Sequence, residues 1–139
     1  MRLVVIALVV TLAAGIGAFW FLTNHRPEEI AASILEIDAL PASAQDVVCW
    51  SPFTTDVITY CHLRIDPSQF DLLLDGRPFE QRTVLPNDRI TTVIRRELRR
   101  AFEPAMSYTV QPPSFTYGGH VQVFANESRT EAVVHIYVE

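Results

Sequence analysis

The sequence predicts an α+β domain preceded by a single transmembrane helix. Three observations lead to this class. Residues 3–22 form one apolar run. Residues 55–65, 120–125 and 131–138 have the pattern of half-buried strands, and the segments between residues 65 and 103 repeat apolar residues at helical spacing. Strands and helices mixed in this order favour two layers, with the helices on one face of a mainly antiparallel sheet.

The N-terminal apolar run is long enough to cross a membrane. It has no charged residue, and a helix of this length spans roughly 30 Å, the thickness of a bilayer's hydrocarbon core. Arg2 and the amino group give its first end a positive charge. Three aromatic residues, which membrane interfaces favour, stand at its other end: Phe19, Trp20 and Phe21. We therefore expect residues 3–22 to hold the protein in a membrane as a single-pass helix.

Two interpretations of this segment differ in whether it is cleaved. In the first, residues 1–25 are an uncleaved signal-anchor, and residues 26–139 are an exported domain on the extracytoplasmic side, periplasmic or extracellular. In the second, the chain is cut after Ala18 and the domain is secreted. The apolar run continues past Ala18, so its length favours the anchor.

Charge and composition indicate which classes of partner and which kind of genome to expect. Arg2 apart, the ten remaining cationic residues and all sixteen acidic ones fall in residues 26–139, which gives that part a net charge of −6. We therefore expect no nucleic-acid partner, because binding to phosphates needs a basic surface. All eleven cationic residues are arginine, which favours a GC-rich bacterial genome.

The first half of the domain predicts a helix, a hairpin and a second helix. Pro27, followed by two glutamates, suits the start of a helix that runs to about Ile37. Strands are expected at residues 47–50 and 55–65. A second helix is expected to start at Asp66 and to end at Gly76 in the left-handed conformation.

The second half predicts one long helix and a terminal hairpin. Residues 77–87 have no clear period. A helix capped by Asp88 is expected over residues 89–102, and a short strand is expected near Tyr108. The last two strands are expected over these residues: 120–125 and 131–138.

The two cysteines fall on the first predicted hairpin. If that hairpin turns around residues 53–56, a symmetric register places Cys49 opposite Cys61. Directly opposed Cβ atoms in an antiparallel pair lie within disulfide reach, and an exported compartment permits the bond. The alternative is that both are small buried hydrophobic residues.

The terminal hairpin predicts one apolar and one polar-aromatic sheet face. A four-residue loop would pair Ala125 with Thr130 and His120 with His135. The core face would then carry Val121, Val123, Ala132, Val134, Ile136 and Val138. The opposite face of the sheet would expose several aromatic and imidazole side chains, and exposed aromatic patches often mark partners. This candidate partner-binding face comprises Trp50, Tyr60, His62, His120, Phe124, His135 and Tyr137.

The same face admits two other interpretations. His62, His120 and His135 would supply three imidazole ligands for a metal ion, but no HxxxH or HExxH spacing supports this, and we expect neither a metal nor a cofactor. Alternatively, these residues only form cross-strand pairs that stabilise a half-exposed sheet.

A basic stripe follows the long helix. Arg89, Arg95, Arg96, Arg99 and Arg100 are grouped on its exposed side, and the last four are the candidates for contact with an anionic surface. Such a group would suit contact with anionic lipid headgroups or an acidic partner. A solvated face balanced by the acidic remainder is the alternative, which the composition favours.

The order of a helix, the turn Leu40-Pro41-Ala42-Ser43-Ala44, strands and a terminal hairpin resembles small uncharacterised bacterial membrane-anchored proteins and lipoproteins with an LPxSA-like turn. The chain departs from the lipoproteins because no cysteine directly follows its apolar run, the first being Cys49. The resemblance implies no activity.

No run of residues matches a specific catalytic or nucleotide-binding motif. The leading hypothesis is a non-enzymatic, membrane-anchored envelope protein that binds another envelope protein or serves as an accessory module. The rival is a membrane-anchored, hydrolase-like enzyme. It would need a pocket that joins two of the three imidazoles to a carboxylate.

Overall fold

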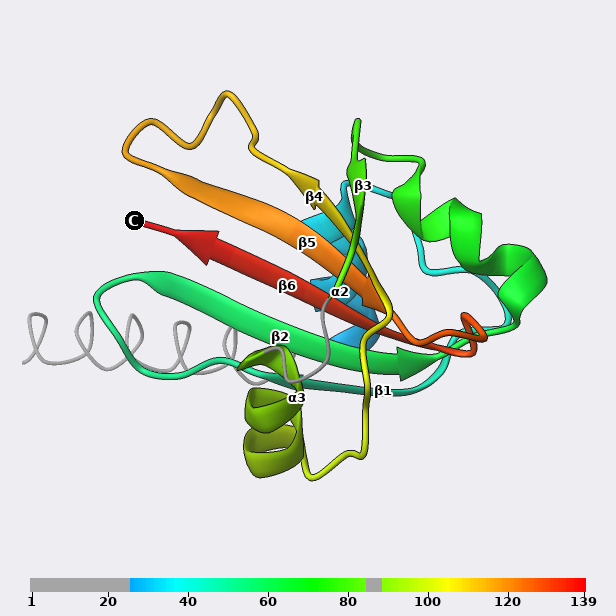
Figure 1. Ribbon diagram of the computed structural model, residues 1–139. Helices are drawn as coiled ribbons and strands as arrows, with labels where there is room; N and C mark the ends of the chain where they lie inside the picture. The colour runs from blue at the N-terminus through cyan, green and yellow to red at the C-terminus, as the bar shows by residue number, and fades with distance from the viewer. Residues whose placement is uncertain (1–25, 85–88) are drawn as a thin grey trace, which may run out of the picture.

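The computed structural model describes residues 26–84 and 89–139 of the chain (Figure 1). These residues form an α+β domain around one six-stranded antiparallel sheet, as the sequence predicts. The strands lie in the order β1-β2-β6-β5-β4-β3. They are β1 Gln45–Trp50, β2 Val57–Arg64, β3 Glu80–Thr83, β4 Met106–Val110, β5 Gly119–Ala125 and β6 Glu131–Val138.

The helical elements are short. They are the α-helix α2 Pro27–Leu35, the 3-10 helix η1 Pro67–Leu74, and the α-helix α3 Arg89–Val93, which continues as the π-helical turn η2 Ile94–Leu98. No helix within the described ranges is long and apolar enough to cross a membrane. The expected transmembrane segment, residues 3–22, and the expected cap Asp88 lie outside the described residues.

Helix α2 covers one face of the sheet. Pro27 occupies its first turn, where a missing N–H breaks no hydrogen bond, and two glutamates follow it. The helix ends at Leu35, two residues earlier than expected, because Glu36 takes the left-handed conformation with φ 56°. Ala31, Ile34 and Leu35 are buried against the sheet.

The turn before β1 is fixed by the start of η1. The Ser43 hydroxyl accepts the Asp66 backbone N–H at 3.1 Å, and the Ser43 N–H donates to the Gln69 side chain at 3.0 Å. Asp66 also caps η1 by accepting from the Ser68 N–H. The polar residues of this turn therefore hold the segment before β1 against the start of η1.

Gly76 differs from expectation. It follows η1, but it is not among the residues with positive φ. A Cβ there would lie only 2.2 Å from the Leu35 carbonyl oxygen. Glycine is needed at this position because the exit of η1 crosses the end of α2 at close range, and not because the backbone turns left-handed.

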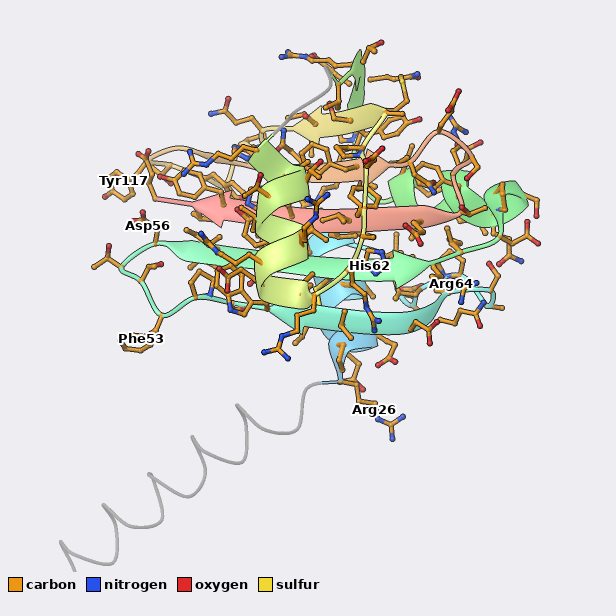
Figure 2. The ribbon with its side chains drawn as sticks, turned by 60° about the horizontal axis from the view of Figure 1, so that its bottom comes forward. Arg26, Phe53, Asp56, His62, Arg64 and Tyr117 are labelled. Carbon is orange, nitrogen blue, oxygen red and sulfur yellow. A yellow bond between two sulfur atoms is a disulfide. The ribbon has the colours of Figure 1, made fainter. Side chains whose placement is uncertain are left out.

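The helices pack on both faces of the sheet, so the expectation of helices on one face is wrong. The larger core lies between the sheet and the layer of α2 and η1. On the opposite face, Ile90, Ile94 and Phe102 pack on Phe124 and Val133. Figure 2 shows α3 in front of the sheet and α2 behind it. Because Phe124 and Val133 are apolar on that second face, it needs a cover of its own.

The terminal hairpin has the expected faces but not the expected register. Ala125 pairs with Ala132 and Gln122 with His135, a shift of two residues from the predicted pairs. The Asn126 side chain accepts the Glu131 N–H at 3.1 Å, which closes a longer loop than predicted. A shift of two keeps every side chain on its predicted face, whereas a shift of one would exchange the faces.

The remaining differences concern β3 and the long helix. Strand β3 lies in the segment expected to be irregular, and all four of its side chains are exposed at the sheet edge. The helix expected to reach residue 102 ends at Leu98, because Arg99 is left-handed with φ 53°. Phe102 reaches the core from the segment that follows.

Candidate functional site

The predicted disulfide is present. Cys49 on β1 and Cys61 on β2 are directly paired, with Cα atoms 4.1 Å apart and bonded sulfur atoms. Cys61 is fully buried in the main core. The Cys49 Sγ atom lies 3.5 Å from the Pro27 carbonyl oxygen. The bond therefore cross-links β1 to β2, and its Cys49 end lies beside the start of α2.

A groove of about 440 Å³ lies between α3, η2 and the second face of the sheet. The sheet supplies its aromatic floor and the helix supplies a basic wall. The floor includes Trp50, Ile58, Tyr60, Gln122, His135 and Tyr137, and the wall includes Arg89, Val93 and Arg96.

The floor of the groove is a row of paired residues that crosses the sheet. Trp50 pairs with Tyr60, and Tyr60 pairs with His135. The Trp50 and Tyr60 rings are stacked with centroids 5.9 Å apart, and the Tyr60 and His135 rings are stacked at 4.3 Å. Cross-strand aromatic pairs of this kind stabilise a sheet and hold the rings in fixed positions.

His135 continues this row through hydrogen bonds. The Gln122 Nε2 donates to the Thr109 hydroxyl at 3.1 Å, so its Oε1 faces His135 Nδ1 at 3.3 Å. This orientation assigns the imidazole proton to Nδ1. Burial lowers the pKa of His135 to about 4, and His120 acts in the same direction. The ring is therefore neutral near pH 7.

The wall brings positive charge to this floor. Burial raises the pKa of the Tyr60 phenol and the nearby Arg89 opposes the rise, so the phenol stays protonated near pH 7. The Arg96 guanidinium pairs with Glu97, whereas Arg89 is exposed and makes no ion pair with a described residue.

His62 lies outside this groove. Its side chain is buried beneath the edge of Phe102, so the expectation that it faces solvent is wrong. Neither ring nitrogen has a hydrogen bond within the described part of the chain, and Nε2 lies 3.8 Å from a Glu131 carboxylate oxygen. Burial lowers the pKa of His62, Glu131 opposes the shift, and Arg100 adds to it.

The three histidines are not brought together as one ligand set. The His120 and His135 rings are 5.3 Å apart, but His62 packs against Phe102. Residues 26–84 and 89–139 contain no group of three or more His, Cys, Asp or Glu side chains that could hold a metal ion.

Most of the predicted partner-binding face lies at the groove, although part of it is covered. Phe124 and His135 line it but are buried, because α3 covers a face that was expected to be open. His120 lies beside it, in contact with His135 and Tyr137. The other predicted members in the lining are Trp50, Tyr60 and Tyr137.

The sequence placed Arg89 and Arg96 only in the basic stripe, and it did not indicate that these two residues and Gln122 would line a groove. The available signal was the apolar Phe124 and Val133 on the second face, which required a covering helix. The stripe itself is exposed as expected, at Arg95, Arg96, Arg99 and Arg100.

Comparisons with protein-family models, with curated proteins and with solved structures found no match.

Proposed function

We propose that this protein is a single-pass, membrane-anchored envelope protein whose extracytoplasmic domain binds a segment of another envelope protein in the groove. The apolar run at residues 3–22 supports the anchor. The disulfide supports an oxidising compartment, since such bonds persist outside the cytosol.

The observation that carries the binding role is the combination of an aromatic floor with an arginine wall. Trp50, Tyr60 and Tyr137 lie in the same groove as Arg89. Aromatic residues and arginine are the types most enriched in the buried centres of protein interfaces. Rings already held by stacking lose little conformational freedom when a partner binds.

The occupant is a segment that carries an acidic side chain beside an apolar one. The apolar side chain contacts the floor, and the carboxylate pairs with Arg89, which has no ion pair among the described residues. Guanidinium–carboxylate hydrogen bonds are stronger than neutral ones. The domain as a whole is acidic, so this groove differs in charge from most of its surface.

The rival, a hydrolase, gains less support. Among the described lining residues there is one histidine and no carboxylate. His135 is held by the amide of Gln122, whereas a general base in a triad is oriented by a carboxylate. The binding role therefore needs only the residues that line the groove, whereas the hydrolase would also need a second histidine and a carboxylate.

Photocrosslinking in native membranes tests the proposal. Benzoylphenylalanine replaces Tyr137 at the groove in the full chain, and Tyr117, an exposed ring on the β4–β5 loop (Figure 2), serves as the control position. We expect a discrete adduct from position 137 that Arg89→Glu removes and Arg82→Glu, on the exposed strand β3, leaves intact.

A peptide with the sequence of the crosslinked segment of the captured partner is then synthesised. We expect it to bind the detergent-solubilised full chain and to bind about tenfold more weakly after its acidic residue becomes an amide. Equal adducts at both positions, or no effect of Arg89→Glu, would overturn the proposal.

A further inference from the structure

Three arginines that lie in η2 or directly after it lack partners within the described domain. Arg95, Arg99 and Arg100 are exposed, and none makes a side-chain hydrogen bond or ion pair with a described residue. The nearest acidic residue in sequence, Glu97, already pairs with Arg96. The result is a local excess of positive charge on a domain of net charge −6.

Most of the other described arginines pair with a carboxylate, whereas Arg26 and Arg89 make no ion pair with a described residue. Besides Arg96 with Glu97, the pairs are Arg64 with Asp46, Arg77 with Glu36, Arg82 with Glu80 and Arg129 with Asp71. Arg95, Arg99 and Arg100 differ from the other two arginines without an ion pair because they are grouped within six residues of the chain.

The unpaired arginines lie at the β1 edge of the sheet. Element η2 packs on β1 and β2, and α2 packs on β1 from the opposite face. The first residue of α2, Pro27, lies against Cys49 of β1. Figure 2 shows α3 crossing the sheet toward the edge from which Arg26 projects. The end of η2 and the start of the described chain thus share one edge.

The segment between the apolar run and the domain is short, so it holds the β1 edge close to the proposed membrane. The apolar run ends at Leu22, and the four residue steps from Leu22 to Arg26 span at most about 14 Å. A domain tethered this closely at its β1 edge holds that edge near the headgroups. The opposite edge, β3, is separated from it by four strands.

We propose that Arg95, Arg99 and Arg100 contact anionic lipid headgroups of the membrane that anchors the chain. Guanidinium groups bind phosphate through paired hydrogen bonds, and basic groups near an anionic surface gain affinity that salt screens. This contact with the headgroups turns the β1 edge of the sheet toward the bilayer. Because Trp50 lies on β1 and lines the groove, that end of the groove then lies near the membrane. This inference rests on the membrane anchorage in the proposed function, but not on what the groove binds.

The test uses the full chain, with its disulfide intact, in lipid nanodiscs that contain a nitroxide headgroup lipid. A fluorophore is attached to Ala101→Cys, an exposed position directly after Arg100, and in a second sample to Thr83→Cys on β3. Discs contain either phosphatidylcholine alone or phosphatidylcholine with phosphatidylglycerol. Quenching reports how close each label lies to the headgroups.

We expect quenching at position 101 to be about twofold greater in anionic discs than in neutral ones, and high salt to remove the difference. Position 83 should show no difference. The triple variant Arg95→Gln, Arg99→Gln and Arg100→Gln should lose the effect, whereas Arg82→Gln should keep it.

Equal quenching at position 101 in both kinds of disc, or an effect that survives in the triple variant, overturns the lipid contact. The triple variant could instead lose a protein adduct that the parent forms in native membranes, while its quenching at position 101 equals that of the parent. The arginines would then bind an acidic protein, and the inference would be wrong. A full chain that elutes separately from the discs refutes the anchorage itself. The groove is judged independently by its crosslinks.

Discussion

The ring of Tyr60 lies nearly parallel to the imidazole of His135, with centroids 4.3 Å apart and planes 12° apart. The two residues are direct partners on the neighbouring strands β2 and β6, beneath the groove. This stack forms while His135 is neutral, because its pKa is about 4. Below neutral pH, protonation of His135 therefore changes the charge of one ring in the floor of the groove.

The first prediction concerns stability in mild acid. The pKa of His135 is about 4 in the folded protein against an ordinary value of 6.5, so the unfolded chain binds a proton first as pH falls. The stability due to the neutral ring is complete above pH 6.5 and is lost between pH 6.5 and 4. The shift corresponds to about 3 kcal/mol. Urea unfolding of the full chain in detergent should show a shallower pH dependence for His135→Gln than for the parent, and identical slopes would contradict this assignment.

The second prediction concerns the partner of that imidazole. Gln122→Glu places a carboxylate beside Nδ1, which favours the protonated ring, so the pKa of His135 should rise by about two units. Titration of the imidazole Cε1–H resonance by NMR measures this change. Gln81→Glu on the exposed strand β3 makes the same chemical change far from His135 and should leave its pKa near 4.

Several features of the fold were predictable because they depend on the spacing of residues within a single strand or hairpin. Alternation of apolar and polar residues fixed which side chains of β5 and β6 face the main core, even though the pairing was off by two residues. The position of Cys49 opposite Cys61 followed from hairpin symmetry. Neither inference needs knowledge of the rest of the fold.

Other features depended on tertiary contacts. Strand β3 carries no apolar alternation because all its side chains are exposed, and its pairing with β4 is made by the backbone. The side of the sheet on which α3 packs depends on Phe124 and Val133, whose burial only appears once Phe102 covers them. Arg89 could not be assigned to a groove before that helix was placed.

The third prediction concerns the cross-link of the outer hairpin. The disulfide joins residues 12 positions apart, so it restricts the unfolded chain by closing a short loop. Replacing both residues, as Cys49→Ala with Cys61→Ala, should lower the free energy of unfolding by about 3 kcal/mol. Urea unfolding with and without reductant measures the effect. Reductant should destabilise the parent and leave the double variant unchanged, and a parent insensitive to reductant would refute the role of the bond.

The fourth prediction concerns the crossing of η1 and α2. Gly76→Ala introduces a Cβ that meets the backbone carbonyl oxygens of Leu35 and Glu36, at 2.2 and 2.7 Å. Backbone atoms at the end of a helix move less readily than side chains, so the variant should lose about 2 kcal/mol of stability. Asp75→Ala, at the exposed neighbouring residue, is the matched control and should change stability little. Equal midpoints for both variants in thermal unfolding would show that the two elements separate easily.

The last prediction concerns the cover of His62. Phe102 is only 2% exposed and packs edge-on against the His62 ring, whereas Phe53 is fully exposed at a loop. Phe102→Ala should therefore cost about 3 kcal/mol through lost burial and the cavity it leaves, while Phe53→Ala should cost almost nothing. Water that enters the cavity also relieves the burial that lowers the pKa of His62, so that pKa should rise toward its ordinary value. Urea unfolding measures the first effect and NMR titration of the imidazole measures the second. A large loss of stability with no change in the titration of His62 would mean that other groups keep the ring dry, and that Phe102 acts only as a packing residue.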